Sequence, residues 1–217
     1  MKIWKKYIDY LLEGEWHIHT SYTNSKGGVL EYCEKAAKLG IPLLAFTEHV
    51  RKNLNYDFNN LLNDIEKARE EFDLIILSGC EAKVLPGGEL DVEEWILRNV
   101  DYPIFAFHSF PRDIDTYIKS LEIALRNKYV NTWAHPGAFL LRHGLELPEK
   151  ELIKIFRLMK KHSVLLEVNK KYKVPFRAWL DIAEKYNVKT VTGNDIHGIE
   201  DLETERQKNV IEPEKTL

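Results

Sequence analysis

Histidine and acidic side chains recur directly after short apolar runs along this chain. Six of its eight histidines follow this pattern, together with one glutamate and one aspartate. The residues are His17, His19, His49, Glu81, His108, His135, Asp195 and His197. Imidazole and carboxylate groups without thiolates favour Zn²⁺, Mn²⁺ or Fe²⁺ over Mg²⁺ or Ca²⁺. Because one zinc site uses only three or four protein ligands, the set predicts two or three divalent metal ions.

The spacing of these residues indicates that they converge. His17 and His19 lie two residues apart, which places both on one face of a strand, and Asp195 and His197 repeat that spacing. Any single member could instead be a capping or hydrogen-bonded core residue. A ligand-type residue after nearly every predicted strand is better explained by one shared metal centre.

Two histidines fall outside the pattern. His162 ends a lysine-rich predicted helix, where a role in balancing the helix dipole is expected. His143 lies in a predicted loop after His135, so its role stays open.

The elements that must position the ligands alternate between short apolar runs and amphipathic segments. We expect strands near 15–18, 42–46, 74–78, 103–107, 129–134, 164–168 and 189–192. We expect helices over 29–40, 58–72, 113–127, 148–162 and 176–187, long loops at 85–91 and 135–148, and a helix in the charged tail after Ile199. This alternation predicts an α/β fold with a parallel sheet, whose strands present their ligands at one mouth. We expect a single domain over residues 1–217.

Composition narrows the functional classes. The chain has 217 residues and a formal net charge of −3, so no overall basic field favours nucleic acid. No apolar run approaches the length of a membrane span, and the charged N-terminal segment does not read as a signal peptide. Cys33 and Cys80 are too few for a disulfide scaffold, and we expect a cytoplasmic protein. The sequence does not indicate an oligomeric state.

The motifs resemble, in order, those of the polymerase and histidinol phosphatase (PHP) family. The resemblance spans about residues 14–200 and rests on WHIHTSYTNSKG, AFTEHV, GCEAKV, FAFHSF, WAHPG, LEVN and TGNDIHG. It implies a distorted (β/α)7 TIM-like barrel with up to three metal ions at the carboxyl ends of the strands. The implied ligand groups are His17, His19, Glu81 and Asp195; then Glu81, His108 and His135; then His49 and His197.

Three positions depart from the family pattern. Ser25 is the nearest counterpart of a further histidine that often follows the first motif, so a third metal ion would have fewer protein ligands. Glu15 and Glu48 stand where the family commonly has aspartate. Both keep the charge, and we expect them to orient neighbouring ligands.

The resemblance implies a metal-dependent phosphoesterase in which a metal-bridging hydroxide attacks phosphorus. We expect Asp195, His197 and Arg142 to act in catalysis. Arg112, Lys83, Lys170 and Lys171 are further candidates for phosphate contacts, against the alternative of ordinary solvated charges.

The expected substrate is a small phosphate monoester, such as histidinol phosphate, or a nucleotide or oligonucleotide phosphate. Because no basic groove is evident, a small-molecule or nucleotide phosphatase is favoured over a processive nuclease. Two other classes stay open: a C–N hydrolase of the amidohydrolase type, and a degenerate barrel that binds metal or phosphate as a regulatory module. Metal content and a panel of ester, amide and lactone substrates would separate them.

Overall fold

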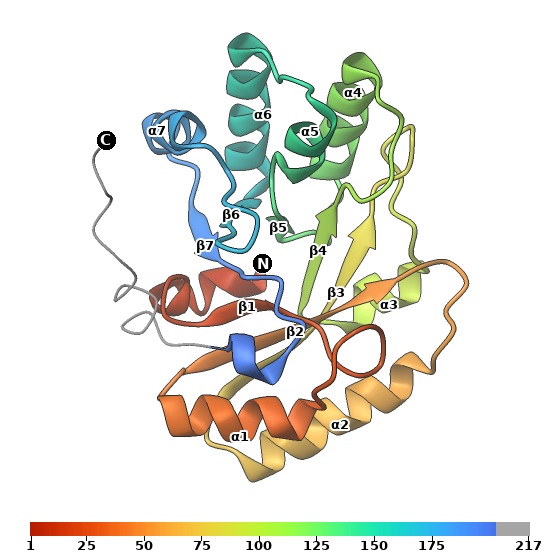
Figure 1. Ribbon diagram of the computed structural model, residues 1–217, viewed down its shortest axis with the longest axis vertical. Coiled ribbons are helices and arrows are strands. Elements are labelled where there is room, and N and C mark those ends of the chain that lie inside the picture. The colour runs from red at the N-terminus through yellow and green to blue at the C-terminus, as the bar shows by residue number, and fades with distance from the viewer. Residues whose placement is uncertain (203–217) are drawn as a thin grey trace.

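Seven parallel strands form one sheet in chain order, from β1 to β7, in the computed structural model, which describes residues 1–202 (Figure 1). The strands are β1 (Glu15–Ile18), β2 (Leu43–Val50), β3 (Ile75–Lys83), β4 (Tyr102–Ala106), β5 (Thr132–Trp133), β6 (Leu165–Val168) and β7 (Thr190–Thr192). Each of the seven predicted strands is present. β2 and β3 are longer than expected, and β5 is shorter.

The sheet curves until its two ends nearly meet. Ile18 at the end of β1 bridges in parallel to Ile196, which follows β7. The His19 amide donates to the Ile196 carbonyl and the Ile196 amide donates to the His17 carbonyl, both at 2.9 Å. The predicted α/β barrel is therefore confirmed. This closure also sets the first and last motifs of the chain side by side.

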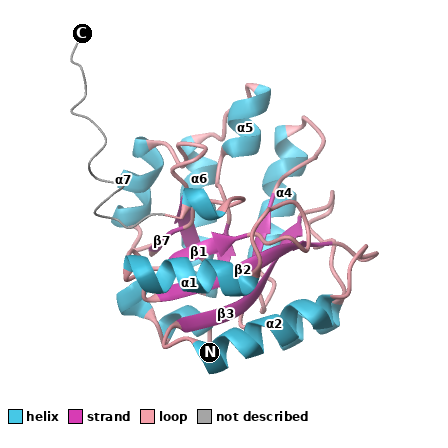
Figure 2. Ribbon diagram, turned by 60° about the horizontal axis from the view of Figure 1, so that its bottom comes forward, coloured by secondary structure: helices cyan, strands magenta, loops and turns pink. Residues whose placement is uncertain are grey.

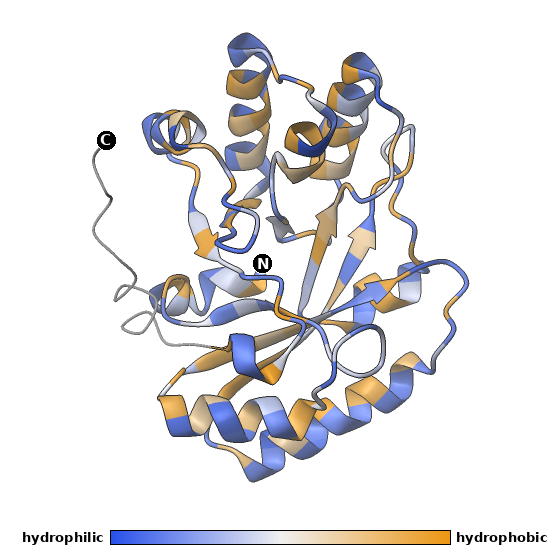
Figure 3. Cartoon of the chain, in the orientation of Figure 1, coloured by the Kyte–Doolittle hydropathy of each residue, from blue (hydrophilic) through white to orange (hydrophobic). Residues whose placement is uncertain are grey.

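Apolar side chains pack on both faces of the strands. A set without α-helix residues includes Leu43, Ala45 and Leu77, and it also receives Trp4 and Leu11 from the N-terminal segment. Since strand side chains alternate between faces, this set fills the barrel interior. A larger cluster joins the other strand faces to the surrounding helices, which carry apolar stripes along their length (Figure 3).

The helices lie outside the strands (Figure 2). They are α1 (Val29–Leu39), α2 (Phe58–Glu71), α3 (Glu94–Asn99), α4 (Ile114–Leu125), α5 (Ala138–His143), α6 (Glu149–His162) and α7 (Arg177–Lys185). α1 ends at Gly40, whose φ of 70° is the left-handed conformation of a glycine C-cap. Asp57 caps α2 by accepting a hydrogen bond from the Asn59 amide.

Two differences from the predicted elements affect the mouth of the barrel. The segment 135–148 is not simply a loop, because it contains α5 just after His135. β2 runs through His49 and β3 runs through Glu81, so these two residues lie inside strands rather than after them. The longer strands fix both side chains on a regular backbone.

Within residues 1–202, no helix is long and apolar enough to cross a membrane. The helix expected in the charged tail falls largely on residues 203–217, which lie outside the described residues.

Candidate metal centre

The structure brings all eight predicted ligands together at the carboxyl end of the barrel. His17, His49 and Glu81 project from β1, β2 and β3, and His19 directly follows β1. The other four ligands follow β4, β5 and β7. Leu43 and Ala45 face the barrel interior, so alternation along β2 carries His49 to the same face. On β3, the same alternation from Leu77 places the Glu81 side chain on the interior face.

Glu81 is the centre of the cluster. Its Oε1 lies 2.9 Å from His135 Nε2, 3.4 Å from His108 Nε2 and 3.6 Å from His17 Nε2. Its Oε2 lies 2.8 Å from His49 Nδ1 and 3.7 Å from His19 Nε2. Burial alone would raise the pKa of Glu81, but the surrounding imidazoles, His108 first, hold that pKa well below its ordinary value. The carboxylate is therefore ionised and shared among five imidazoles.

Asp195 joins the two histidines of the first motif. Its Oδ1 lies 3.0 Å from His19 Nε2 and 3.5 Å from His17 Nε2. Burial lowers the pKa of His19 to about 3, which leaves this imidazole neutral with a lone pair available. His17, His19 and Asp195 are all buried and form one possible metal-binding group.

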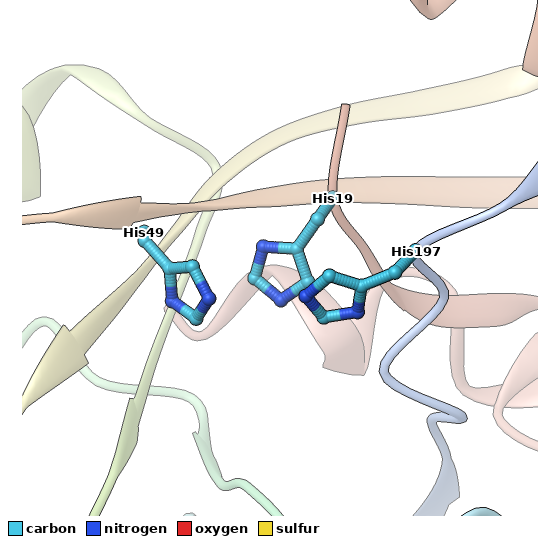
Figure 4. Close-up of side chains that lie close together, drawn as sticks. All are labelled: His19, His49 and His197. Atoms are coloured by element: carbon cyan, nitrogen blue, oxygen red, sulfur yellow. The ribbon is translucent and has the colours of Figure 1, made fainter. Parts of the chain in front are cut away.

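Two further groups share members with the first. His49, Glu81 and His108 form one of them. His19, His49 and His197 form the other, and their rings gather from three separate segments (Figure 4). In each group, one ligand atom per residue lies within 4.8 Å of the others.

The chemistry of this donor set fits divalent metal ions. Two of its buried polar atoms, Glu81 Oε2 and His19 Nδ1, have no hydrogen-bond partner within residues 1–202. Glu81 Oε2 lies 2.8 Å from His49 Nδ1, but this close contact does not form a hydrogen bond. A buried polar atom without a partner is costly, and coordination of a cation would remove that cost for a carboxylate oxygen. The imidazole and carboxylate donors suit Zn²⁺, Mn²⁺ or Fe²⁺.

Glu167 on β6 holds two of the ligands in place, although it was not predicted as a site residue. His17 Nδ1 lies 2.6 Å from Glu167 Oε1, so an Nδ1–H donates there and Nε2 is left facing the other ligands. The His135 amide donates to the other oxygen of Glu167. An acidic residue in a buried apolar run was the signal that could have identified this role.

Glu15 and Glu48 accept hydrogen bonds from residues next to the ligands. Glu15 accepts hydrogen bonds from the amide and the side chain of Asn194, at 2.8 and 2.5 Å, beside Asp195. Glu48 accepts hydrogen bonds from the Thr20 amide and the Thr23 hydroxyl, which fixes the loop after β1. In that loop, Ser25 Oγ lies 2.8 Å from the Tyr32 hydroxyl, so its hydrogen bond is directed to α1.

Among the predicted phosphate contacts, Lys171 lies nearest the ligands. Its Nζ is 3.1 Å from Asp195 Oδ2, and the neighbouring Tyr172 hydroxyl donates to the same oxygen at 2.8 Å. Arg142 is exposed on α5. Burial and the Asp195 carboxylate raise the pKa of Tyr172, and the positive charge of Arg142 acts in the opposite direction. Tyr172 was not among the predicted site residues, because only the folded loop brings it to Asp195.

Three other cations were predicted to contact phosphate. Lys83 lies 3.8 Å from Asp91 Oδ2, and Arg112 is exposed near His143. Lys170 is exposed in the loop after β6.

Two of the ligands have left-handed backbone conformations. His135 has φ of 30° and Asp195 has φ of 52°. Such conformations cost a non-glycine residue about 1–3 kcal/mol and are found mostly at functional sites. Here they turn side chains inward immediately after β5 and β7.

Two histidines and two cysteines are not among the predicted ligands. His162 is the last residue of α6, as predicted, and His143 packs its ring 4.5 Å from that of Phe139. Cys80 and Cys33 are buried free thiols, and burial raises the pKa of Cys33 to about 12.

The comparisons with known proteins agree with this geometry. A DNA polymerase/3′-5′ exonuclease (PolX) of Bacillus subtilis is 31% identical over 209 residues, which are 88% of this chain and 35% of that protein. A probable phosphatase of Clostridium acetobutylicum is 28% identical over 163 residues, 70% of this chain and 62% of that protein. The chain thus spans about a third of the first relative and less than two thirds of the second.

The fold matches a solved structure as well. The Lactococcus lactis histidinol phosphate phosphatase, complexed with Zn, L-histidinol and phosphate, superposes with a TM-score of 0.67 at 17% identity, covering 86% of this chain and 87% of that one. The family model of the PHP domain matches residues 15–171, from β1 into the loop after β6. Together with the ligand motifs in their expected order, this match shows that the chain belongs to the PHP domain family.

Proposed function

We propose that this protein is a metal-dependent phosphoesterase that hydrolyses small phosphate monoesters or nucleotide phosphates. The observation that carries the proposal is the buried Glu81 carboxylate, which lies within 3.7 Å of five imidazoles from four segments of the barrel. No structural role requires so many titratable groups around one carboxylate. A centre for divalent cations does.

Divalent ions at this centre would activate a water molecule and stabilise negative charge on phosphoryl oxygens. The chain's own residues would provide the remaining functions. Glu167 holds His17 in one tautomer and fixes the His135 backbone, so both imidazoles keep their orientation. Arg142, which is exposed on α5 after His135, would contact the phosphoryl group, and Asp195 and His197 would complete the catalytic set.

The net charge and the relatives bear on the substrate class. The chain has a net charge of −3, so its overall field does not favour a nucleic acid backbone. The name of the Clostridium relative, a probable phosphatase, supports a monoester. The name of the Bacillus relative includes a 3′-5′ exonuclease, so a phosphodiester substrate is the second candidate.

A substrate panel tests the proposal. Purified protein is stripped with a chelator, reloaded with Mn²⁺ or Zn²⁺, and assayed on p-nitrophenyl phosphate, bis(p-nitrophenyl) phosphate, an amide and a lactone. We expect metal-dependent turnover that is greatest for the monoester. Turnover of only the amide or lactone would indicate a C–N hydrolase, and metal binding without any turnover would indicate a regulatory module.

A further inference from the structure

The loop between β6 and α7 folds back across the mouth of the barrel. Asn169 and Val174 pair as an antiparallel bridge, with the Asn169 amide donating to the Val174 carbonyl at 2.8 Å and the Val174 amide donating back at 3.1 Å. The Tyr172 amide donates to Asn169 Oδ1 at 3.0 Å. These bonds fix the turn that carries Lys171 and Tyr172 to the ligands.

Lys171 makes three polar contacts at one edge of the ligand set. Its Nζ lies 2.9 Å from the Asp195 carbonyl oxygen, 3.1 Å from Asp195 Oδ2 and 3.2 Å from His197 Nδ1. Because Tyr172 also donates to Oδ2, that oxygen receives two donors. Asp195 therefore offers only Oδ1 to the group formed with His17 and His19.

The three possible metal-binding groups cannot all keep three ligands at once. His19 belongs to the group with His17 and Asp195, and His49 belongs to the group with Glu81 and His108. When those two groups are filled, the third retains His197 as its own member. It is also the group without a carboxylate, whereas each of the others contains one.

The positive charge of Lys171 also disfavours a metal ion in the group that contains His197. A divalent ion beside His197 would face the Lys171 ammonium across a few ångströms. The nearest carboxylate is Asp195, whose Oδ1 lies 3.4 Å from His197 Nδ1, and it already pairs with that ammonium through Oδ2. Serine hydroxyls could supply an extra ligand, but Ser25 is hydrogen-bonded to Tyr32. The position beside His197 is thus suited to a fixed ammonium.

We propose that Lys171 takes the place of a third metal ion, so that the loaded protein holds two divalent cations and one lysine ammonium. The inference rests on the metal-binding part of the proposed function and concerns the number of ions, not the reaction. Lys171 acts as a positioning residue that holds Asp195 and supplies positive charge beside His197.

The test counts metal ions in the resting protein. Wild type, Lys171→Glu and Lys173→Gln are stripped, titrated with Mn²⁺ by calorimetry, and analysed by mass spectrometry after removal of free metal. Lys173 is an exposed lysine of the same loop and serves as the control. We expect two ions in wild type and in Lys173→Gln, and three in Lys171→Glu, where a carboxylate replaces the ammonium.

Three ions in the wild type would overturn the inference, and so would two ions in Lys171→Glu. Circular dichroism checks that the variants fold, and Lys171→Gln, with the same expected third ion, replaces Lys171→Glu if that variant does not. Because ions are counted without substrate, a protein that binds two ions but lacks phosphatase activity would contradict the proposed function alone.

Discussion

At the scale of single residues, the metal ligands are held in place by carboxylates that are not themselves predicted ligands. Glu167 accepts from the His17 ring and the His135 backbone, and Glu15 accepts from Asn194 beside Asp195. The ligand types and their order were predictable from the sequence, because each motif is local. The contacts of Glu167 and Tyr172 were not, because they join residues far apart in the chain.

Replacing Glu167 by glutamine should weaken metal binding without removing a ligand. The amide keeps the shape but loses the charge that orients His17, so we expect about a 10–100-fold loss of metal affinity. Competition with a metal-binding dye measures the affinity. Glu184→Gln, an exposed change on α7, is the control and should bind as wild type does. Equal affinity in all three proteins would refute the role of Glu167.

The two cysteines should be chemically inert in the folded protein. Both are buried, and burial raises the pKa of Cys33 to about 12, so almost no thiolate exists near neutral pH. We expect iodoacetamide to leave activity unchanged at pH 8, with labelling appearing only in denaturant. Rapid inactivation with the metal content preserved would instead indicate a nucleophilic thiol.

At the scale of elements, the strands place ligands by their length and by close backbone approach. β2 and β3 extend through His49 and Glu81 because pairing between them continues to Val50 and Ala82. The apolar runs did not predict this extension, because the carboxyl-terminal parts of both strands contain polar residues. α5 was missed because its residues follow a proline and a glycine that read as loop.

Gly193, just after β7, should be intolerant of a side chain. A Cβ there would collide with Glu167 Oε1 and would also approach the His17 Cβ to 3.0 Å. We expect Gly193→Ala to lower the free energy of unfolding by about 1–3 kcal/mol and to weaken metal binding as well. Urea unfolding and metal titration measure the two effects.

Gly40→Ala is the matched comparison for that variant. Its φ of 70° makes alanine unfavourable there by about 1–2 kcal/mol, yet a Cβ would meet no atom within 4 Å. We expect lower stability with unchanged metal affinity. If both variants lost metal equally, the loss would follow general destabilisation rather than displacement of Glu167.

At the scale of the whole molecule, closure of the barrel brings the metal ligands together. The β1 to Ile196 bridge joins the first motif to the last, and ligands from six of the seven strand segments meet only in the closed barrel. The family resemblance anticipated this architecture because its motifs span nearly the whole chain. Binding to the folded state alone should therefore stabilise it.

Metal addition should raise the melting temperature. At a free ion concentration about 100 times Kd, one bound ion adds about 2.7 kcal/mol, which corresponds to a shift of roughly 5–10 °C for a chain of this size. Differential scanning calorimetry with Mn²⁺ and with chelator measures the shift. Glu81→Gln should show little shift, and an equal shift in that variant would place the binding elsewhere.

The most direct test of the central claim is phosphate release from p-nitrophenyl phosphate by wild type and Glu81→Gln, each stripped of metal and then titrated with Mn²⁺. We predict that stripped wild type releases phosphate no faster than buffer, that activity returns in proportion to bound metal, and that Glu81→Gln stays inactive at every Mn²⁺ concentration. Undiminished phosphate release by the stripped wild type, or full activity of Glu81→Gln, would contradict a metal-dependent phosphoesterase centred on Glu81.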